Sequence, residues 1–130
     1  MTTDYLPSES EVFMNPQQVA HFRQRLLVMK AELEQELRHV PHMEPDETAR
    51  EGDQTDHSSA DTEHEFDLLN RVRIQALLHQ AERALARLDN GSYGYCEDTG
   101  EPIGLKRLIA QPATSLSLEA QEARERRARA

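Results

Sequence analysis

Apolar residues recur in the first half of the chain with the spacing of one helix face. Asn15 and Pro16 suit the start of this helix, because asparagine caps a helix and proline fits its first position. Pro41 and Pro45 each remove a backbone donor, so the helix is predicted to end or kink there. The apolar positions lie three or four residues apart, which predicts one long amphipathic helix; they are Phe22, Leu26, Met29, Leu33 and Leu37.

A second helix is predicted after a polar and acidic stretch. Residues 43–65 are polar with Gly52 in the middle, which is typical of a turn between helices. Helical composition resumes at Ser58 or Ser59, and Asn90 with Gly91 favours a helix stop. The two helices are predicted to fold back antiparallel around the acidic tip at 46–60. The seam has the alternating four and three spacing of a coiled coil; its members are Ile74, Leu78, Ala81, Leu85 and Leu88.

The rest of the chain has a different character. Residues 1–14 lack periodicity and are predicted to form a loosely docked arm. Residues 91–117 hold scattered apolar positions among glycines and prolines, and 118–130 read as a final helix rich in Glu, Ala and Arg. The predicted fold class is therefore mainly α: a long antiparallel coiled-coil hairpin over 15–90, a small globular region over 91–117 and a C-terminal helix.

Composition and charge reduce the number of possible functions. With 130 residues, 5% aromatics and a mean hydropathy of −0.79, the chain cannot bury a large core. Residues 1–66 carry 15 acidic and 5 basic side chains, whereas 67–130 carry 9 and 10. The acidic half disfavours nucleic acid and suits a basic protein cleft or a metal-bearing site. The chain shows no phosphate loop, HExxH or serine elbow, so no enzyme is expected.

Cysteine content and the N-terminal sequence favour a cytoplasmic protein. A single cysteine cannot form an intrachain disulfide, which fits a reducing compartment. The N-terminus has no basic and apolar regions of a signal peptide, and no apolar run is long enough to span a bilayer. We expect a cytoplasmic protein that makes no contact with a membrane.

The segment from Gly91 to Leu108 resembles a zinc knuckle that lacks most of its ligands. A knuckle of this kind binds zinc through two pairs of cysteines, because four donors must close a tetrahedron around the ion. A methyl group and two hydroxyls cannot replace thiolates, so zinc is predicted to be absent and no cofactor is expected. The four positions are Cys96, Thr99, Ser117 and Ala120.

These motifs together resemble the DksA/TraR family of RNA polymerase-binding transcription factors, over roughly residues 13–125. The pairs Cys96-x-x-Thr99 and Ser117-x-x-Ala120 resemble its cysteine-poor, zinc-independent members. The other matching segments are Phe13-Met-Asn-Pro-Gln-Gln-Val-Ala-His-Phe22, the helix from Phe66 to Leu88, Gly94-Tyr-Cys96, Gly100-Glu-Pro-Ile-Gly-Leu-Lys-Arg-Leu108 and Pro112.

The resemblance implies a mechanism at RNA polymerase. The hairpin would enter the secondary channel of the enzyme and modulate the stability of promoter open complexes, as a monomer without sequence-specific DNA binding. The family's tip motif, Asp-x-x-Asp-x-Ala, falls on Asp53, Asp56 and Ser58, so a serine replaces the alanine. Ser58 is open to a second interpretation, as the N-cap of the second helix.

The resemblance also bears on ppGpp, the alarmone of the stringent response. In this family ppGpp is held jointly by the polymerase and by basic residues of the regulator. The corresponding positions here are Gln80, Gln111 and Gln121. Glutamine supplies no charge toward phosphates, so we expect weak synergy with ppGpp.

Two other functions remain open from the sequence. A Gre-type transcript-cleavage factor enters the same channel and uses tip carboxylates to help hold a catalytic metal. A helical adaptor would bind another partner through its coiled coil and have no transcriptional activity. Transcript cleavage in stalled complexes distinguishes the first, and the effect of Asp53→Asn with Asp56→Asn on inhibition distinguishes the second.

Overall fold

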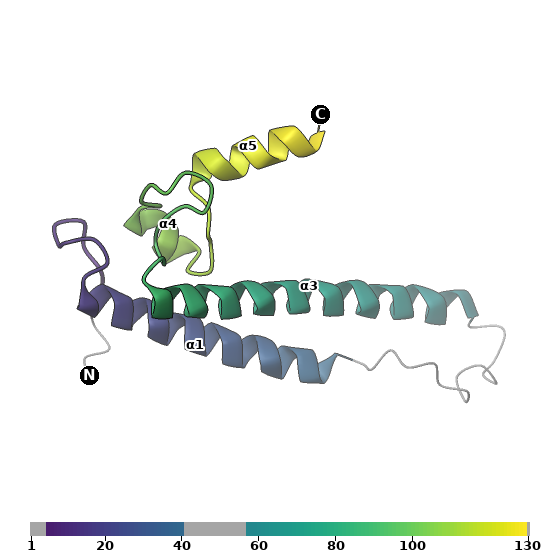
Figure 1. Ribbon diagram of the computed structural model, residues 1–130. Coiled ribbons are helices and arrows are strands. Elements are labelled where there is room, and N and C mark those ends of the chain that lie inside the picture. Colours follow the sequence, from purple (N-terminus) through teal and green to yellow (C-terminus); the bar gives the residue numbers. More distant parts are fainter. Residues whose placement is uncertain (1–4, 41–56, 130) are drawn as a thin grey trace. The chain divides into compact units, whose positions relative to one another are not determined.

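The computed structural model describes residues 5–40 and 57–129, except the side chains of 57–61. Its helices are α1 (Pro16–His39), α3 (His57–Asn90), α4 (Leu105–Ala110) and α5 (Leu118–Arg129) (Figure 1). Within those two ranges the only extended pairing is an isolated bridge between Tyr95 and Pro102. The predicted class, mainly α, is therefore confirmed.

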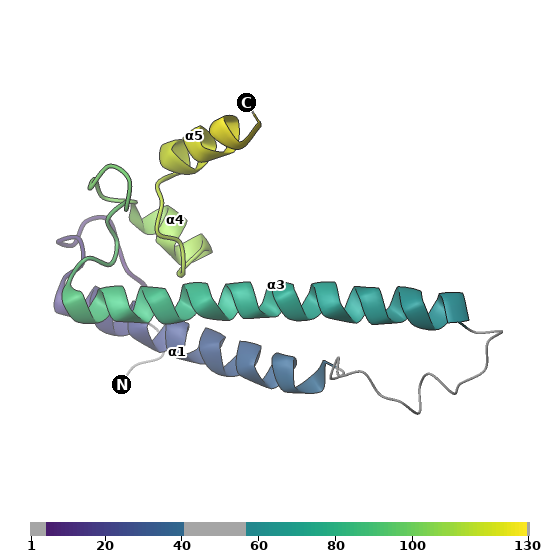
Figure 2. The ribbon, with the colours of Figure 1, turned by 45° about the vertical axis from the view of Figure 1, so that its right-hand side comes forward.

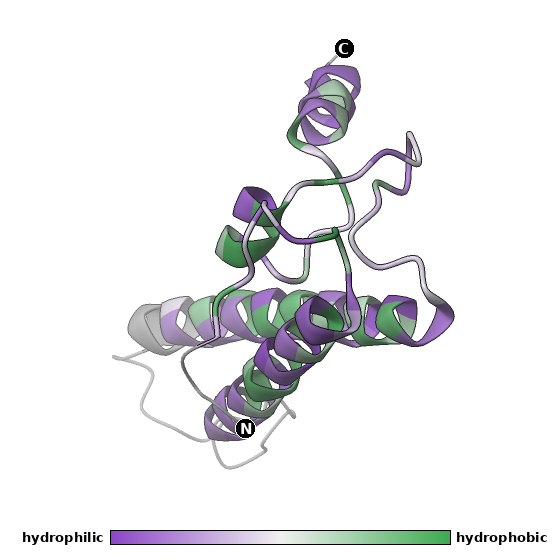
Figure 3. Cartoon of the chain, turned by 90° about the vertical axis from the view of Figure 1, so that its left-hand side faces the viewer, coloured by the Kyte–Doolittle hydropathy of each residue, from purple (hydrophilic) through white to green (hydrophobic). Residues whose placement is uncertain are grey.

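Two compact units make up the chain. Unit 1 combines Met1–Lys30 with His79–Ala130, and unit 2 is Ala31–Leu78. Hydrophobic and hydrophilic residues share the surfaces of both long helices, as amphipathic helices require (Figure 3). None of the helices in the described ranges is long and apolar enough to cross a membrane.

Helix α1 begins where the sequence predicts. The Gln18 amide N–H donates to Asn15 Oδ1 at 2.9 Å, so Asn15 is the N-cap. In return, Gln18 Oε1 accepts from the Met14 amide at 2.7 Å. The helix ends at His39, two residues before Pro41, as expected because the residue before a proline avoids the helical conformation. Pro41 and Pro45 themselves lie outside the described residues.

Helix α3 begins at His57, one residue before the predicted start, and ends at Asn90 as predicted. Gly91 follows with φ of +84°, a conformation that glycine adopts without strain. The Ser92 amide then donates to the Arg87 carbonyl at 3.0 Å, which satisfies a carbonyl of the last turn. The helix stop is therefore a Schellman-type end.

In unit 1, α1 and α3 run antiparallel (Figure 2). Arg23 pairs with Asp89 at 2.9 Å and Lys30 with Glu82 at 3.9 Å. A later residue of α1 therefore contacts an earlier residue of α3, as the antiparallel arrangement requires. Of the predicted seam, Ala81 and Leu88 are buried and Leu85 is half-buried. Ala84 is also buried although the predicted seam omitted it. Its small side chain belongs to the same cluster as the Phe22 and Tyr93 rings.

Unit 2 has the same antiparallel pairing. Arg73 contacts Glu36 at 3.3 Å, and Arg71 Nη2 donates to the Val40 carbonyl at 3.2 Å. Ile74 is fully buried in this unit. Leu33 and Val40 are buried, and Leu37 and Leu78 are half-buried. The predicted apolar faces of both helices therefore pack inward here as well.

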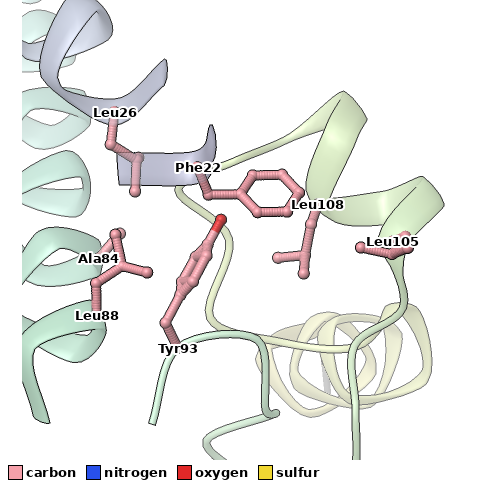
Figure 4. Close-up of a cluster of buried hydrophobic side chains, with 7 residues drawn as sticks. All are labelled: Phe22, Leu26, Ala84, Leu88, Tyr93, Leu105 and Leu108. Atoms are coloured by element: carbon pink, nitrogen blue, oxygen red, sulfur yellow. The ribbon is translucent and has the colours of Figure 1, made fainter. Parts of the chain in front are cut away.

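The core lies in unit 1 and joins α1, α3 and the region after α3 (Figure 4). Burial of each large apolar side chain stabilises the fold by about 1.5–3 kcal/mol. The short helix α4, which the sequence did not predict, supplies two members. Tyr93 also donates its hydroxyl to the Pro112 carbonyl at 2.6 Å. The cluster comprises Phe22, Leu26, Ala84, Leu88, Tyr93, Leu105 and Leu108.

The described part of the N-terminal arm is held more firmly than its composition indicates. Tyr5 donates its hydroxyl to Glu11 at 2.7 Å. The Phe13 ring meets the Tyr95 ring edge-on at 5.6 Å. Gly94 allows Phe13 and Met14 to lie this close, because a Cβ there would lie 3.2 Å from Phe13 Cζ and 3.0 Å from Met14 Cγ. Aromatic contacts of this kind leave no periodic pattern in the sequence.

Candidate functional site

The loop around Cys96 is closed by backbone hydrogen bonds. The Cys96 amide donates to the Glu101 carbonyl, and the Gly100 amide donates to the Cys96 carbonyl, both at 2.8 Å. The Glu97 amide donates to the Ser115 carbonyl at 2.9 Å, which ties this loop to the segment before α5. The backbone therefore keeps the closed form of a knuckle.

The structure brings the four predicted zinc-ligand positions together. Cys96, Ser117 and Ala120 are buried, whereas Thr99 is exposed. Both Ser117 and Thr99 hydrogen-bond to the Cys96 thiol through backbone and side chain. Ser117 Oγ also accepts from the Ala120 amide at 3.2 Å and so caps the first turn of α5. Each non-cysteine polar position thus has a role in local hydrogen bonding.

These contacts change the acidity of Cys96. Burial opposes ionisation of the thiol, but the hydrogen bonds from Ser117 and Thr99 outweigh it and lower the pKa of Cys96 to about 6. The thiolate is therefore stabilised by neutral donors from its own loop and from the residue that precedes α5.

The donor set does not fit a four-cysteine zinc site. A closed tetrahedral site needs four strong donors. These positions offer one thiol, two hydroxyls and a methyl group. Elsewhere in the two described ranges, no three His, Cys, Asp or Glu side chains are grouped so that they could hold a metal ion.

Polar side chains connect the segments around the knuckle instead. Arg124 of α5 contacts Asp98 through two hydrogen bonds, at 2.8 and 2.5 Å. The hydrogen bond from Arg124 lowers the pKa of Asp98. Glu97 accepts from Arg83 of α3 at 2.6 Å and from the Ser115 hydroxyl at 3.1 Å. Sequence reasoning missed these contacts, because opposite charges distant in sequence can pair in many ways.

The predicted ppGpp positions lie on three different segments of unit 1. Gln80 on α3 and Gln111 after α4 are exposed. Gln121 on α5 is half-buried and accepts a hydrogen bond from Arg107. Arg107 also donates to the Leu116 carbonyl at 2.8 Å, so it joins α4 to the start of α5. Gln121 is therefore engaged in an internal contact.

The predicted tip lies at the border of the described residues. Asp53 and Asp56 fall outside them. Ser58 is the second residue of α3, although its side chain is not described. The interpretation of Ser58 as the N-cap is therefore wrong, because the helix already includes His57.

Comparison with known protein families matches nearly the whole described chain. The model of the DnaK suppressor protein DksA N-terminal domain matches residues 18–88. The model of the prokaryotic dksA/traR C4-type zinc finger matches residues 91–126. A zinc-finger domain of this family is therefore present, with one of its four cysteines.

Individual relatives are similar in sequence to this chain over most of their length. The RNA polymerase-binding transcription factor DksA of Caulobacter vibrioides is 47% identical over 128 residues, covering 98% of this chain and 89% of that protein. The protein of the same name from Escherichia coli is 35% identical, covering 88% and 76%. The structure of transcription factor DksA2 from Pseudomonas aeruginosa superposes with a TM-score of 0.76 at 33% identity, covering 95% and 94%. By its two domains, its relatives and its fold, the chain belongs to the DksA/TraR family.

Proposed function

We propose that this protein is a DksA-type transcription regulator that binds RNA polymerase through the secondary channel and shortens the lifetime of promoter open complexes. The observation that carries the proposal is the 47% identity over 98% of the chain to a protein named as an RNA polymerase-binding transcription factor. Its action is a coupling free energy between regulator binding and the open complex, and it makes and breaks no bond. Because its partner would be RNA polymerase, the protein in this proposal acts in the cytoplasm, as a monomer.

The working end in this proposal is the acidic tip. Asp53 and Asp56 match both aspartates of the family's tip motif. Short carboxylates accept hydrogen bonds from mobile elements of the polymerase without forming a rigid clamp. Ser58 adds a hydroxyl at the second position of α3, where the family has a methyl group, and retunes the same contact.

The fold in this proposal is independent of zinc. The unsuitable donor set supports this, as do the core around Tyr93 and the contacts of Glu97 and Asp98 with arginines. A chelator should leave the thermal melting curve unchanged. A four-cysteine member of the family serves as the control and should lose stability. Loss of the folded state of this chain on chelation would reject zinc independence.

Synergy with ppGpp is weak in this proposal. Exposed Gln80 and Gln111 bring no charge to a phosphate group, and Gln121 accepts from Arg107. The increase in inhibition that ppGpp causes therefore depends only on the residues that the polymerase contributes to the ppGpp site.

Transcription in vitro from a ribosomal RNA promoter tests the function. Purified bacterial RNA polymerase should be inhibited by the chain, and ppGpp should increase the inhibition only weakly. The pair Asp53→Asn and Asp56→Asn should abolish inhibition and retain polymerase binding, whereas Glu63→Gln with Glu65→Gln, exposed on α3, should change neither.

Three results would contradict parts of this proposal. Absence of both binding and inhibition rejects the function itself. Strong cleavage of RNA in stalled elongation complexes points to a Gre-type factor instead. Inhibition that persists in the tip double variant places the active surface elsewhere and favours an adaptor-like mode of binding.

A further inference from the structure

Met14 has a backbone conformation that is unusual for its residue type. Its φ is +56°, and among the described residues no other residue except glycine has a positive φ. A residue with a side chain rarely adopts this left-handed conformation, so its contacts have to stabilise it. Met14 lies where the N-terminal arm, described over residues 5–14, meets the Asn15 cap of α1. Backbone strain is therefore stored at the base of the arm.

The side chain of Met14 supplies contacts that hold this conformation. Met14 Cγ and Sδ lie 3.0 and 3.1 Å from the position that a Cβ on Gly94 would occupy, so the thioether packs directly over that glycine. The Met14 amide donates to Gln18 Oε1 at 2.7 Å, and Gln18 is fully buried. Beside Met14, the Phe13 ring meets the Tyr95 ring edge-on. Closure of the arm therefore combines a strained backbone with an apolar thioether contact.

The Met14 thioether is also accessible to small molecules. Met14 is half-buried and lines a cavity of about 590 Å³ beside α1. The lining is apolar except for Arg23 and Gln24, and Leu27 at this cavity is 47% exposed. A hydroperoxide can therefore reach the sulfur while the chain is folded. The other lining residues are Pro16, Val19, Ala20, Arg23, Gln24 and Leu27.

We propose that Met14 is a site of reversible oxidation that releases the N-terminal arm. A hydroperoxide supplies the oxygen: a lone pair of the sulfur attacks the peroxide, the S–O bond forms and the O–O bond breaks. The proton of the transferred hydroxyl moves to the leaving hydroxide, which departs as water. The sulfur is oxidised and the peroxide reduced by two electrons, and methionine sulfoxide reductases reverse the change. Neither the site nor its chemistry depends on the proposed function.

Oxidation weakens the contact that offsets the strain at Met14. The sulfoxide is polar, whereas the contact that it replaces is apolar. On the side of Gly94 the new oxygen would meet the backbone, because the sulfur already lies against it. On the opposite side the oxygen points into the cavity and is hydrated most easily when the side chain leaves the apolar lining. The left-handed φ of Met14 then relaxes as the arm opens.

Hydrogen–deuterium exchange of the full chain, before and after conversion of Met14 by hydrogen peroxide, tests the proposal. Mass spectrometry of the peptides reports the conversion. The hydrogen-bonded amides of Glu11 and Met14 should exchange roughly fivefold faster or more after oxidation, and a methionine sulfoxide reductase should restore slow exchange.

Two leucine variants assign the effect to one sulfur. Met14→Leu keeps an apolar side chain of similar size and lacks the thioether, so exchange in its arm should not respond to peroxide. Met29→Leu is the matched control, because Met29 is also half-buried but lies within α1. Its arm should respond to peroxide as that of the unsubstituted chain does. Met14→Gln replaces the thioether with a polar side chain and should open the arm without peroxide.

Three results would overturn the proposal. Slow exchange in the arm at full conversion of Met14 would show that the sulfoxide is accommodated over Gly94. Equal opening by peroxide in Met14→Leu and the unsubstituted chain would assign the response to another group, such as Cys96. Resistance of Met14 to peroxide while Met29 is converted would show that the cavity does not give access to the sulfur.

Discussion

The Arg124 guanidinium holds the Asp98 carboxylate through two hydrogen bonds, which join α5 to the loop that carries Cys96. In a four-cysteine zinc finger the metal joins two ligand pairs from such segments. Here the ion pair connects the loop of the first pair with the helix that holds Ala120. The connection depends on two charged side chains, so substitution of either one removes it.

Removal of this ion pair should loosen α5. Arg124→Gln keeps a long polar side chain and loses the charge, so amide protons of α5 should exchange faster in hydrogen–deuterium exchange, by at most roughly fivefold, because exposed pairs are weak. Arg126→Gln is the control, since Arg126 is an exposed arginine on the same helix. Equal exchange in both variants would show that other contacts hold α5.

The hydroxyl of Tyr93 should contribute measurably to stability. It donates to the Pro112 carbonyl at 2.6 Å inside the core, and burial raises the pKa of Tyr93, which keeps the hydroxyl protonated. Tyr93→Phe leaves a buried carbonyl without this donor and should lower the free energy of unfolding by about 1–3 kcal/mol. Tyr95→Phe is the control, because Tyr95 meets Phe13 through its ring. Urea denaturation measures both, and equal losses would contradict the assignment.

Substitution of Gly94 should cost more stability than substitution of Gly91, a glycine of similar conformation. Gly94 has φ of +92° and Gly91 has φ of +84°, so alanine at either position carries similar backbone strain of about 1–2 kcal/mol. Only at Gly94 would the added Cβ meet neighbours, at 3.0 Å from Met14 Cγ; around Gly91 the space is open. Gly94→Ala should therefore lose more stability than Gly91→Ala and expose residues 5–14 to proteolysis. Protection of these residues in both variants would show that Met14 shifts at little cost.

Local signals in the sequence were sufficient to predict the long helices α1 and α3. The apolar spacing of α1, the Asn15 cap and the Gly91 stop each depend on residues within one or two turns. Ala84 was missed because a four-three pattern cannot tell whether alanine or the neighbouring Leu85 faces a bulky partner. Helix α4 was missed because six residues span fewer than two turns and show no period.

The contacts of the knuckle region were beyond sequence reasoning for another reason. Asp98 and Arg124 are 26 residues apart, and Arg107 and Gln121 are 14 apart. Which charges pair at such separations is decided by the tertiary fold. The absence of three of the four thiolates could be read directly, but the hydrogen bonds from Ser117 and Thr99 to Cys96 required the structure.

Those hydrogen bonds make stability depend on pH in a defined range. The ordinary thiol pKa is 9.0, whereas burial and the stronger opposing hydrogen bonds give Cys96 a pKa of about 6 in the folded chain. Between these values the unfolded chain binds a proton that the folded chain does not, so the free energy of unfolding rises with pH. The contribution is complete above pH 9 and is lost as the pH falls to about 6.

Cys96→Ser isolates this contribution, because serine keeps a small polar side chain and does not titrate in this range. Under reducing conditions, urea denaturation at pH 6 and pH 9 should show a larger gain of stability for the unmodified chain than for the variant. Every other titrating group is common to both proteins, so the difference between the two gains reports Cys96. Thr99→Val removes one of the hydrogen bonds to the sulfur and should raise the pKa of Cys96. The pH range between the folded and the unfolded pKa, over which stability rises with pH, then becomes narrower. Equal gains in the unmodified chain and Cys96→Ser would mean that the folded thiol titrates like a free one, and that Ser117 and Thr99 shape the loop without stabilising a thiolate.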